Sequence, residues 1–361
     1  MNKKAIVAMS GGVDSSVAAF LMQEQGYECI GATMKLFHNE DICLSGSHTC
    51  CSLDDVEDAK NVAFKLGIPH YAFNFTERFK EDVIDAFVAA YENGRTPNPC
   101  IDCNRYLKFE KLLRRAQELE YDYVATGHYA KIEYDAAIGR YLLKRAADKT
   151  KDQSYVLYSM TQAQLAHTQF PLGAMTKTEV RAVAEAQGFQ NAKKHDSQDV
   201  CFVPSGHYAD FIEGYTNKTY PQGDFISPDG TVLGRHNGII RYTIGQRKGL
   251  GISADRPLYV SAIDPQANTV TLTEESGLYT KTLTANQINL IAVSEIKEPL
   301  HVTAKIRYRH KDEPAIVIQT DNDTIRVTFD TPQRAVTRGQ AVVLYDGDVV
   351  LGGGVICESN E

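Results

Sequence analysis

A glycine-rich turn near the start of the chain constrains the fold more than any other feature of the sequence. Residues 10–16 read Ser-Gly-Gly-Val-Asp-Ser-Ser, between a predicted apolar strand at residues 3–9 and a predicted helix at residues 15–25. Glycines let backbone N–H groups approach a polyanion, and the N-terminus of a helix adds partial positive charge. The Walker pattern G-x-x-x-x-G-K-[ST] is absent from this segment, so the turn is not the usual P-loop. We therefore expect a different phosphate-binding loop at the carboxyl end of a strand.

The alternation of strand and helix continues over the first half of the chain. Apolar runs predict strands at residues 28–34, 70–75 and 121–126, and helical spacing predicts helices at residues 52–67, 79–94 and 176–188. The last of these helices opens on Thr176-Lys-Thr-Glu179, which has the form of a capping box. Repeated β-α-β units imply an α/β fold with a doubly wound parallel sheet and helices on both faces. Such sheets bind their ligands at the carboxyl ends of the strands.

Beyond about residue 205 the helical signal fades, and short β-rich runs are separated by Gly, Pro, Asn and Asp. These runs span residues 258–263, 269–272, 302–308, 315–319, 325–329 and 341–344. The pattern predicts a small mixed or β central domain followed by a C-terminal β-barrel. We place the three domains at residues 1–205, 206–282 and 283–361.

The composition limits the class of protein and its partners. The 361 residues include 38 basic and 46 acidic ones, a net charge of −8, so a polyanionic partner must be met by local basic patches. No stretch approaches the ~18 uninterrupted apolar residues of a membrane span, and the loop begins too near Met1 to leave room for a signal or transit peptide. We expect a cytoplasmic protein with no membrane partner. Its eight cysteines are too sparse for a disulfide scaffold, and clustered cysteines in a reducing compartment indicate catalysis or metal binding.

The loop at residues 10–16 matches the SGGxDS signature of the PP-loop ATP pyrophosphatases. The resemblance implies a fold of the adenine nucleotide alpha hydrolase type and cleavage of ATP between its α- and β-phosphates. Such enzymes adenylate a carbonyl oxygen and release diphosphate. Asp14 would then help to hold Mg²⁺ near the diphosphate.

Five further segments, in order along the chain, resemble motifs of the tRNA-specific 2-thiouridylases. They are Asn-Pro-Cys-Ile-Asp-Cys-Asn at residues 98–104 with Lys108-Phe109, Lys-Asp-Gln-Ser-Tyr at 151–155, Asp196-Ser197 with Cys201-Phe202, Tyr-Thr-Ile-Gly-Gln-Arg-Lys-Gly-Leu-Gly at 242–251, and Arg307-Tyr308-Arg309. With the loop, the matches run from residue 8 to residue 309. The resemblance therefore covers most of the chain.

This resemblance implies an enzyme that replaces the C2 oxygen of the wobble uridine (position 34) of tRNA with sulfur, converting ATP to AMP and diphosphate. It also implies roles for individual positions. ATP would be bound by Ala8, Met9, Ser10, Gly11, Gly12, Val13, Asp14, Ser15, Met34 and Gly127. The target base would lie against Asn98, Pro99 and Cys100, and other parts of the tRNA against Lys151, Asp152, Gln153, Arg307 and Tyr308. Cys201 would carry a persulfide, and Cys103 would be the partner cysteine.

The substrates and partners implied are tRNAs that read Lys, Glu and Gln codons and a sulfur donor, either a cysteine desulfurase or a sulfur-relay protein. The residue types suit the chemistry, because adenylation turns the oxygen of a poorly electrophilic C2 carbonyl into a leaving group. Cys103 could then release the sulfur by attacking Cys201, leaving a disulfide for a reductant. Lys193, Lys194 and His195 are near enough in sequence to favour a thiolate at Cys201.

A second mechanism stays open, because many family members carry Asp where this chain has Cys100. Cys100 and Cys103 form a C-x-x-C pair, and with Cys201 they make three thiolates. Three thiolates suit a [4Fe–4S] cluster with one open iron, and no persulfide is needed in that case. The sequence favours neither mechanism.

Basic residues gather in three segments that could meet tRNA phosphates. They are Arg105, Lys108, Lys111, Arg114 and Arg115; Lys144, Arg145, Lys149 and Lys151; and Lys305, Arg307, Arg309 and Lys311, the last expected to alternate along a strand. The cysteines outside the motifs have other expected places: a loop over the active site for Cys43, Cys50 and Cys51, which together with His48 could otherwise bind zinc, and the core for Cys29 and Cys357.

Two other classes of function compete with a tRNA sulfurtransferase. A PP-loop ligase would adenylate a small molecule and accept ammonia or an amine, but no glutaminase segment is visible and two cysteine blocks would be idle. A tRNA-binding protein without turnover would need a damaged loop or cysteine, whereas Asp14, Cys103 and Cys201 are all present.

Overall fold

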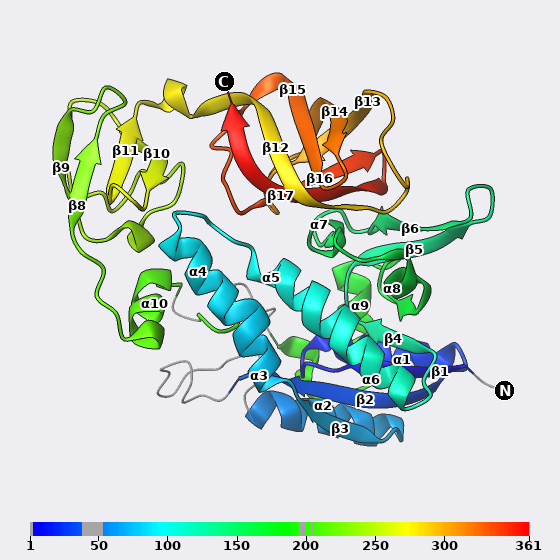
Figure 1. Ribbon diagram of the computed structural model, residues 1–361. Coiled ribbons are helices and arrows are strands. Elements are labelled where there is room, and N and C mark those ends of the chain that lie inside the picture. Colours follow the sequence, from blue (N-terminus) through cyan, green and yellow to red (C-terminus); the bar gives the residue numbers. More distant parts are fainter. Residues whose placement is uncertain (1–2, 38–52, 195–199, 204–205, 361) are drawn as a thin grey trace. The chain divides into compact units, whose positions relative to one another are not determined.

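The computed structural model describes residues 3–37, 53–194, 200–203 and 206–360. The chain forms two compact units and passes between them more than once (Figure 1). The first unit takes Met1–Val83, Cys100–Gly206 and Asp348–Leu351, and the second takes Ile84–Pro99, His207–Gly347 and Gly352–Glu361. Several expected features lie outside the described residues, namely Cys43, His48, Cys50, Cys51, His195, Asp196 and Ser197.

A five-stranded parallel sheet in the order β3-β2-β1-β4-β7 forms the centre of the first unit. Its strands are β1 (Lys4–Ala8), β2 (Glu28–Lys35), β3 (His70–Asn74), β4 (Tyr123–Thr126) and β7 (Thr168–Gln169). The longer helices of this unit are α1 (Val13–Glu24), α2 (Leu53–Leu66), α6 (Leu112–Glu118) and α9 (Lys177–Ala186). The parallel sheet and the predicted strands in it are therefore confirmed.

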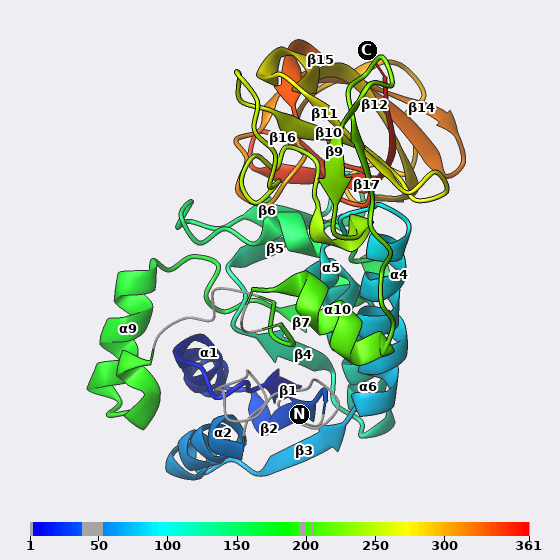
Figure 2. The same cartoon turned by 90° about the vertical axis from the view of Figure 1, so that its left-hand side faces the viewer.

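Alternate residues of each strand face opposite sides of the sheet, and each side has its own helices (Figure 2). Ala5 and Val7 of β1 pack with α1, α2 and α9 in one apolar cluster. Ile6, between them, packs with Leu112 and Ala116 of α6 on the other side. The sheet is thus doubly wound, as predicted.

Shorter elements complete the first unit. They are α3 (Thr76–Phe79), α5 (Pro99–Asp102), α7 (Ser154–Leu157), α8 (Gln162–Ala166), a 3₁₀ turn (Gln190–Lys193) and the hairpin β5 (Ala130–Asp135) with β6 (Arg140–Arg145). Two stretches, Lys80–Asp85 and Cys103–Lys111, are wound as π-helix. The helix predicted at residues 79–94 is therefore three pieces: the end of α3, a π-helical stretch and α4 (Ala86–Glu92).

The second unit begins with α4 and α10 (Tyr208–Thr216) and a four-stranded sheet in the order β10-β11-β8-β9. The strands of this sheet are β8 (Gly223–Ile226), β9 (Val232–His236), β10 (Tyr259–Asp264) and β11 (Thr269–Thr273), with 3₁₀ turns at Ile239–Arg241 and Glu275–Leu278. Glu92 at the end of α4 accepts hydrogen bonds from Lys218 Nζ and Tyr220 OH, both at 2.7 Å. These bonds tie residues 84–99 to the residues that follow α10.

Six strands close a barrel in the second unit, because β12 pairs with both β15 and β17 (Figure 1). They are β12 (Tyr279–Leu290), β13 (Leu300–Lys305), β14 (Glu313–Asp321), β15 (Thr324–Arg334), β16 (Ala341–Asp346) and β17 (Val349–Asn360), in the order β12-β15-β14-β13-β16-β17. The first residues of β17, Val349 and Val350, pair with β6. The predicted C-terminal barrel is confirmed, and the domain limits at residues 205 and 282 stay predictions.

Three expectations need correction or comment. β13 ends at Lys305, so the basic residues at 307–311 lie in a turn and do not alternate along a strand as predicted. Cys29 is buried in the core as predicted, whereas Cys357 is only partly buried. Within the part of the chain that the structure describes, no helix has the length and apolar character to cross a membrane.

Candidate active site

The glycine-rich loop joins β1 to α1, which begins at Val13 after an extended Gly12. Glycine has no side chain to cap the helix, so the first-turn N–H groups are left for another acceptor. The hydroxyl groups of Ser15 and Ser16 each donate to the Gly12 carbonyl oxygen at 3.0 Å. Ser15 Oγ also accepts from the backbone N–H of Ser10 at 3.2 Å. These hydrogen bonds fix the conformation of the loop, and no side chain among the described residues caps the first turn of α1.

Asn191 and Asp55, both distant from the loop in the sequence, pack against it. Asn191, which is buried, donates through Nδ2 to the Gly11 carbonyl and to Ser16 Oγ, both at 2.9 Å. Gly11 has a φ of +74°, and a Cβ there would lie 2.3 Å from the Asp55 carbonyl oxygen. Only glycine fits this position.

Lys194, expected to favour a thiolate at Cys201, forms ion pairs with two carboxylates of α2. Its Nζ lies 2.6 Å from carboxylate oxygens of both Asp55 and Asp58, and these partners raise the pKa of Lys194 against the effect of burial. Lys194 therefore links α2 to the residues that follow the 3₁₀ turn Gln190–Lys193. Lys193 is exposed.

Of the two predicted adenosine-binding positions, the structure brings Gly127 directly against the loop. A Cβ on Gly127 would lie 2.7 Å from the carbonyl carbon of Asp14 and 2.8 Å from the backbone nitrogen of Ser15. Met34, at the carboxyl end of β2, is half-buried and pairs with Phe73 of β3. Both lie at the carboxyl edge of the sheet, where doubly wound folds bind ligands.

Asp14 is held by two side chains that the sequence analysis missed. Lys177 Nζ lies 2.7 and 2.8 Å from the two carboxylate oxygens, and Tyr129 OH donates to Oδ1 at 2.8 Å. Lys177 is the first residue of α9, whose capping box of Thr176 and Glu179 is present as predicted. The capping box was the only sequence signal near Lys177. The close spacing of Asp14 and Lys177 depends on packing between segments 163 residues apart.

A single carboxylate beside the expected phosphate-binding loop suits Mg²⁺, which proteins bind with one or two carboxylates plus substrate phosphates. Asp14 therefore fits the expected magnesium ligand, provided that Lys177 gives up the carboxylate to the ion. The side chain of Lys177 is mostly buried, which places its charge close to the loop.

Asp152 and Gln153, expected to contact tRNA, are used inside the first unit. Asp152 accepts from the backbone N–H of Ala146 at 3.0 Å and from Ser154 Oγ at 2.7 Å. Gln153 Oε1 accepts from the backbone N–H of Tyr129 at 2.9 Å, and its own N–H donates to the Tyr129 carbonyl at 2.8 Å. The hydrogen bonds of both residues therefore hold the backbone segment that contains Lys151 in place.

Cys103 is the first residue of the nine-residue π-helical stretch Cys103–Lys111. Such stretches are rare and often lie at functional sites. Burial raises the pKa of the Cys103 thiol, Lys108 opposes that shift, and Asp102 adds to it. Burial likewise raises the pKa of Asp102 to about 6, against the effect of Arg105. The surroundings therefore keep Cys103 as a thiol until another group favours its ionisation.

Lys108 also contacts His128, which follows Gly127. Burial and the Lys108 charge hold the pKa of His128 well below its ordinary value, so the ring is neutral at pH 7. Lys108 Nζ lies 3.5 Å from His128 Nε2, and Thr126 Oγ1 lies 2.7 Å from Nδ1. Since Lys108 can only donate, the ring proton lies on Nδ1 and is donated to Thr126. This series of contacts links the π-helical stretch Cys103–Lys111 to the end of β4.

Cys201 lies in a turn whose neighbour Phe202 is buried against Phe79, with ring centroids 5.7 Å apart. Cys100, Cys103 and Cys201 all belong to the first unit. Among the residues that the structure describes, which include these three, no group of three or more His, Cys, Asp or Glu is placed to hold a metal ion. The described structure therefore does not group Cys100, Cys103 and Cys201 as ligands of one cluster.

The remaining predicted tRNA contacts belong to the second unit. Asn98 and Pro99 follow Thr96 and Pro97, whose carbonyls accept from Gln340 Nε2 at 2.8 and 3.2 Å. Arg307 Nη2 donates to the carbonyls of Ile244 at 3.2 Å and Ala335 at 2.7 Å, and bonds Thr337. This arginine therefore holds the loop at Ile244 against residues 335–337. Tyr308, beside it, is partly exposed next to Lys305.

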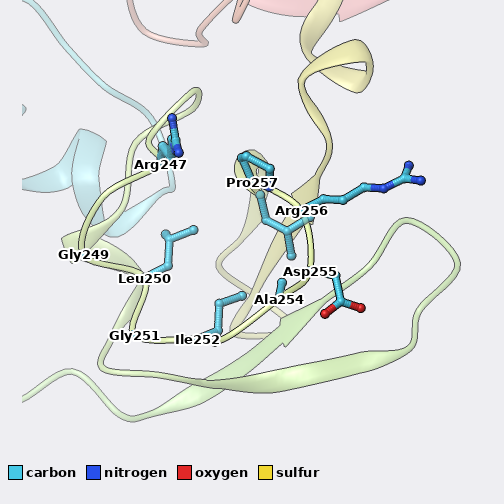
Figure 3. A pocket seen from close by; sticks show the side chains of 10 residues that line it. Arg247, Gly249, Leu250, Gly251, Ile252, Ala254, Asp255, Arg256 and Pro257 are labelled. Carbon is cyan, nitrogen blue, oxygen red and sulfur yellow. The ribbon is translucent and has the colours of Figure 1, made fainter.

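The motif at residues 242–251 lies in a loop that borders a shallow hollow of about 450 Å³ in the second unit (Figure 3). Gln246 braces this loop, accepting from Thr243 N–H and donating to the Lys248 carbonyl, both at 3.0 Å. Arg247 is exposed on one side of the hollow, and Arg256 extends outward to pair with Glu274 at 2.9 Å.

Three family models match the chain one after another. They are the tRNA methyl transferase HUP domain over residues 3–205, the tRNA methyl transferase PRC-barrel domain over residues 209–274 and the aminomethyltransferase beta-barrel domain over residues 280–356. The first model alone covers more than half of the chain.

Curated relatives match over nearly their whole length. The tRNA-specific 2-thiouridylase MnmA of Clostridioides difficile is 50% identical over 360 residues, 99% of each chain. The protein of the same name from Acetivibrio thermocellus is 52% identical over 357 residues, 98% of this chain and 99% of its own. That of Clostridium acetobutylicum is 48% identical over 356 residues, 99% of this chain and all of its own. The loop, the cysteine blocks and the three-part architecture agree with these matches, and the chain belongs to the tRNA-specific 2-thiouridylase family.

Proposed function

We propose that this chain thiolates C2 of the wobble uridine, position 34, of tRNA by adenylating the C2 oxygen and transferring sulfur through Cys201 and Cys103. Membership of the family makes it an ATP-using tRNA-uridine 2-sulfurtransferase. The observation that carries the finer proposal is one compact unit that contains the glycine-rich loop, Asp14 and both cysteines.

The loop would bind the phosphates of ATP through the first-turn N–H groups of α1 and the hydroxyl of Ser10. Mg²⁺, when bound, would neutralise charge on the departing diphosphate. Asp14 would hold it, and Lys177 would then face the phosphates instead of the carboxylate. Met34 and Gly127 would border the adenosine.

The C2 oxygen of uridine would attack the α-phosphorus, breaking its bond to the bridging oxygen so that diphosphate leaves. The terminal sulfur of a Cys201 persulfide then attacks C2, and AMP leaves with the former carbonyl oxygen. Cys103 thiolate attacks Sγ of Cys201, which breaks the persulfide bond and leaves thiouridine and a Cys103–Cys201 disulfide. A dithiol reductant restores both thiols, and a cysteine desulfurase or relay protein supplies the next sulfur.

The target base would lie against Asn98, Pro99 and Cys100, after leaving the anticodon stack at a cost of a few kcal/mol. Lys151, Asp152 and Gln153 would contact other parts of the tRNA, as would Arg307 and Tyr308. The internal hydrogen bonds of Asp152, Gln153 and Arg307 would hold these two segments in place. The substrate tRNAs would be those reading Lys, Glu and Gln codons.

The test is an anaerobic assay of diphosphate release and tRNA thiolation with an unmodified tRNA transcript, ATP, cysteine and a cysteine desulfurase. We expect Cys103→Ser and Cys201→Ser to lose thiolation more than 100-fold while tRNA-dependent diphosphate release continues, because adenylation precedes sulfur transfer. Cys357→Ser is the control, since its partner, the Thr284 carbonyl, can also accept from serine.

Two results would contradict the proposal. Diphosphate release that needs a small-molecule acceptor instead of tRNA would favour a ligase. Loss of both iron and thiolation in Cys100→Ser would favour the cluster and remove the persulfide from the mechanism.

A further inference from the structure

Asp14 is connected to the segment at residues 148–153 by two separate sets of hydrogen bonds. This segment includes Lys151, Asp152 and Gln153, which the proposed function assigns to tRNA. We propose that tRNA binding at this segment and Mg²⁺–ATP binding at Asp14 are thermodynamically coupled through Tyr129 and Asp148. The inference rests on the proposed function, because it needs tRNA at residues 151–153.

The first connection runs through Tyr129. Gln153 forms two hydrogen bonds with the backbone of Tyr129, at 2.9 Å to its N–H and 2.8 Å to its carbonyl. Tyr129 is 2% exposed, and its hydroxyl donates to Asp14 Oδ1 at 2.8 Å. A displacement of Gln153 therefore moves the backbone that carries this phenol, and tight packing leaves the ring little room to compensate.

The second connection runs through Asp148 and α9. Asp148 Oδ2 accepts from the backbone N–H of Lys177 at 3.0 Å, and Oδ1 accepts from the N–H of Thr150 at 2.9 Å. The Asp148 carbonyl accepts from the N–H of Lys151 at 3.1 Å. Lys177 in turn reaches both oxygens of Asp14. The backbone position of Lys177 is thus fixed by the same short segment that holds Lys151.

Both connections end on the carboxylate that would receive Mg²⁺. While Lys177 holds Asp14, the ion must compete with an ammonium group for the same two oxygens. A ligand at residues 148–153 that shifts this segment alters the position of Lys177 and of the Tyr129 hydroxyl together. Coupling between two sites is reciprocal, so tRNA must change nucleotide affinity by the same factor as nucleotide changes tRNA affinity. This arrangement would limit ATP cleavage when no tRNA is present.

The coupling is measured by titrating α,β-methylene-ATP with Mg²⁺ into the full-length protein by calorimetry, with and without an unmodified tRNA transcript. We expect tRNA to tighten analogue binding about tenfold, within the 5- to 150-fold range of typical couplings. Tyr129→Phe keeps the ring and removes the bond to Asp14, and Asp148→Ala removes the bond to Lys177. Each variant should reduce the factor by which tRNA tightens analogue binding several-fold. In the double variant, analogue affinity with and without tRNA should differ by less than twofold.

Matched controls lie on the exposed hairpin of the same unit. Tyr134→Phe removes a hydroxyl from an exposed ring, and Asp135→Ala removes a carboxylate that accepts from the N–H of Ala137 in a comparable turn. Both should keep the wild-type factor. Direct tRNA binding in the absence of nucleotide should stay within twofold of wild type for Tyr129→Phe, which separates lost coupling from lost RNA binding.

The inference is wrong if tRNA leaves analogue affinity unchanged in a wild-type enzyme that thiolates tRNA, or if Tyr129→Phe and Asp148→Ala both keep the full factor. A wild-type enzyme that neither binds nor thiolates tRNA would instead overturn the proposed function. Thermal unfolding of each variant identifies one that has failed to fold, and the other variant then carries the test.

Discussion

At the scale of single residues, the ionisation of Cys103 depends on two charged neighbours with opposite effects. Burial disfavours the thiolate, Asp102 disfavours it further, and Lys108 favours it. From the sequence we expected Lys193, Lys194 and His195 to favour a thiolate at Cys201, and the structure pairs Lys194 with Asp55 and Asp58. The identity of Cys103 as a candidate came from its motif, whereas its neighbours are known only from the fold.

Opposite shifts in the reactivity of Cys103 test this account. Lys108→Met removes a charge that favours the Cys103 thiolate, so the pKa of Cys103 should rise. Alkylation of Cys103 by iodoacetamide should then require a higher pH than in the wild type. Asp102→Asn removes an unfavourable charge, so its profile should move to lower pH. The rate of Cys103 alkylation against pH, followed by mass spectrometry of the peptide, gives both shifts. Equal profiles in the two variants would contradict the assignment.

At the scale of elements, the N-terminus of α9 has two functions. Its capping box satisfies backbone groups, since Thr176 Oγ1 accepts from the Glu179 N–H and the Glu179 carboxylate accepts from the Thr176 N–H. It also fixes the residue next to it, Lys177, which reaches Asp14. The capping box was readable because it is local, and the contact with Asp14 was not, because it joins two elements distant in sequence.

The structure offers a matched pair to separate these functions, because α8 also begins with a capping box, at Thr161 and Gln164. Thr176→Ala and Thr161→Ala should each cost about 1 kcal/mol of unfolding free energy, the usual value of an N-cap. Only Thr176→Ala should weaken binding of α,β-methylene-ATP, by several-fold, since only it precedes Lys177. Urea unfolding and calorimetry measure the two effects. Equal loss of nucleotide affinity in both variants would refute the link.

At the scale of the whole molecule, a chain of net charge −8 must bind a polyanion through local basic groups. Several members of the expected patches are already paired: Lys144 with Glu133, Arg114 and Arg115 with Glu118, and Lys111 with Glu110. Such ion pairs at the surface contribute little stability and can exchange their partners for phosphates. Affinity for tRNA should therefore be modest and strongly dependent on salt.

Filter binding of a tRNA transcript at 50 to 300 mM salt measures this dependence. The logarithm of the association constant should fall linearly with the logarithm of salt concentration. Lys151→Gln should reduce the slope by about 1, the value of one phosphate contact. Lys297→Gln is the control, because Lys297 is exposed and pairs with Glu295 outside the proposed contacts. A flat salt dependence would exclude a phosphate-based interface.

The sequence by itself determined the alternation of strands and helices around the parallel sheet, the glycine-rich loop after the first strand, the C-terminal barrel and the family, because each depends on local periodicity or on contiguous motifs. Tertiary structure alone decided that Lys177 and Tyr129 hold Asp14 and that Arg307 is used to brace its own unit. It also decided the π-helical winding at Cys103 and the grouping of residues 84–99 with the second unit. These features arise from packing between segments distant in sequence, and no local pattern of residue types records which distant side chains will meet.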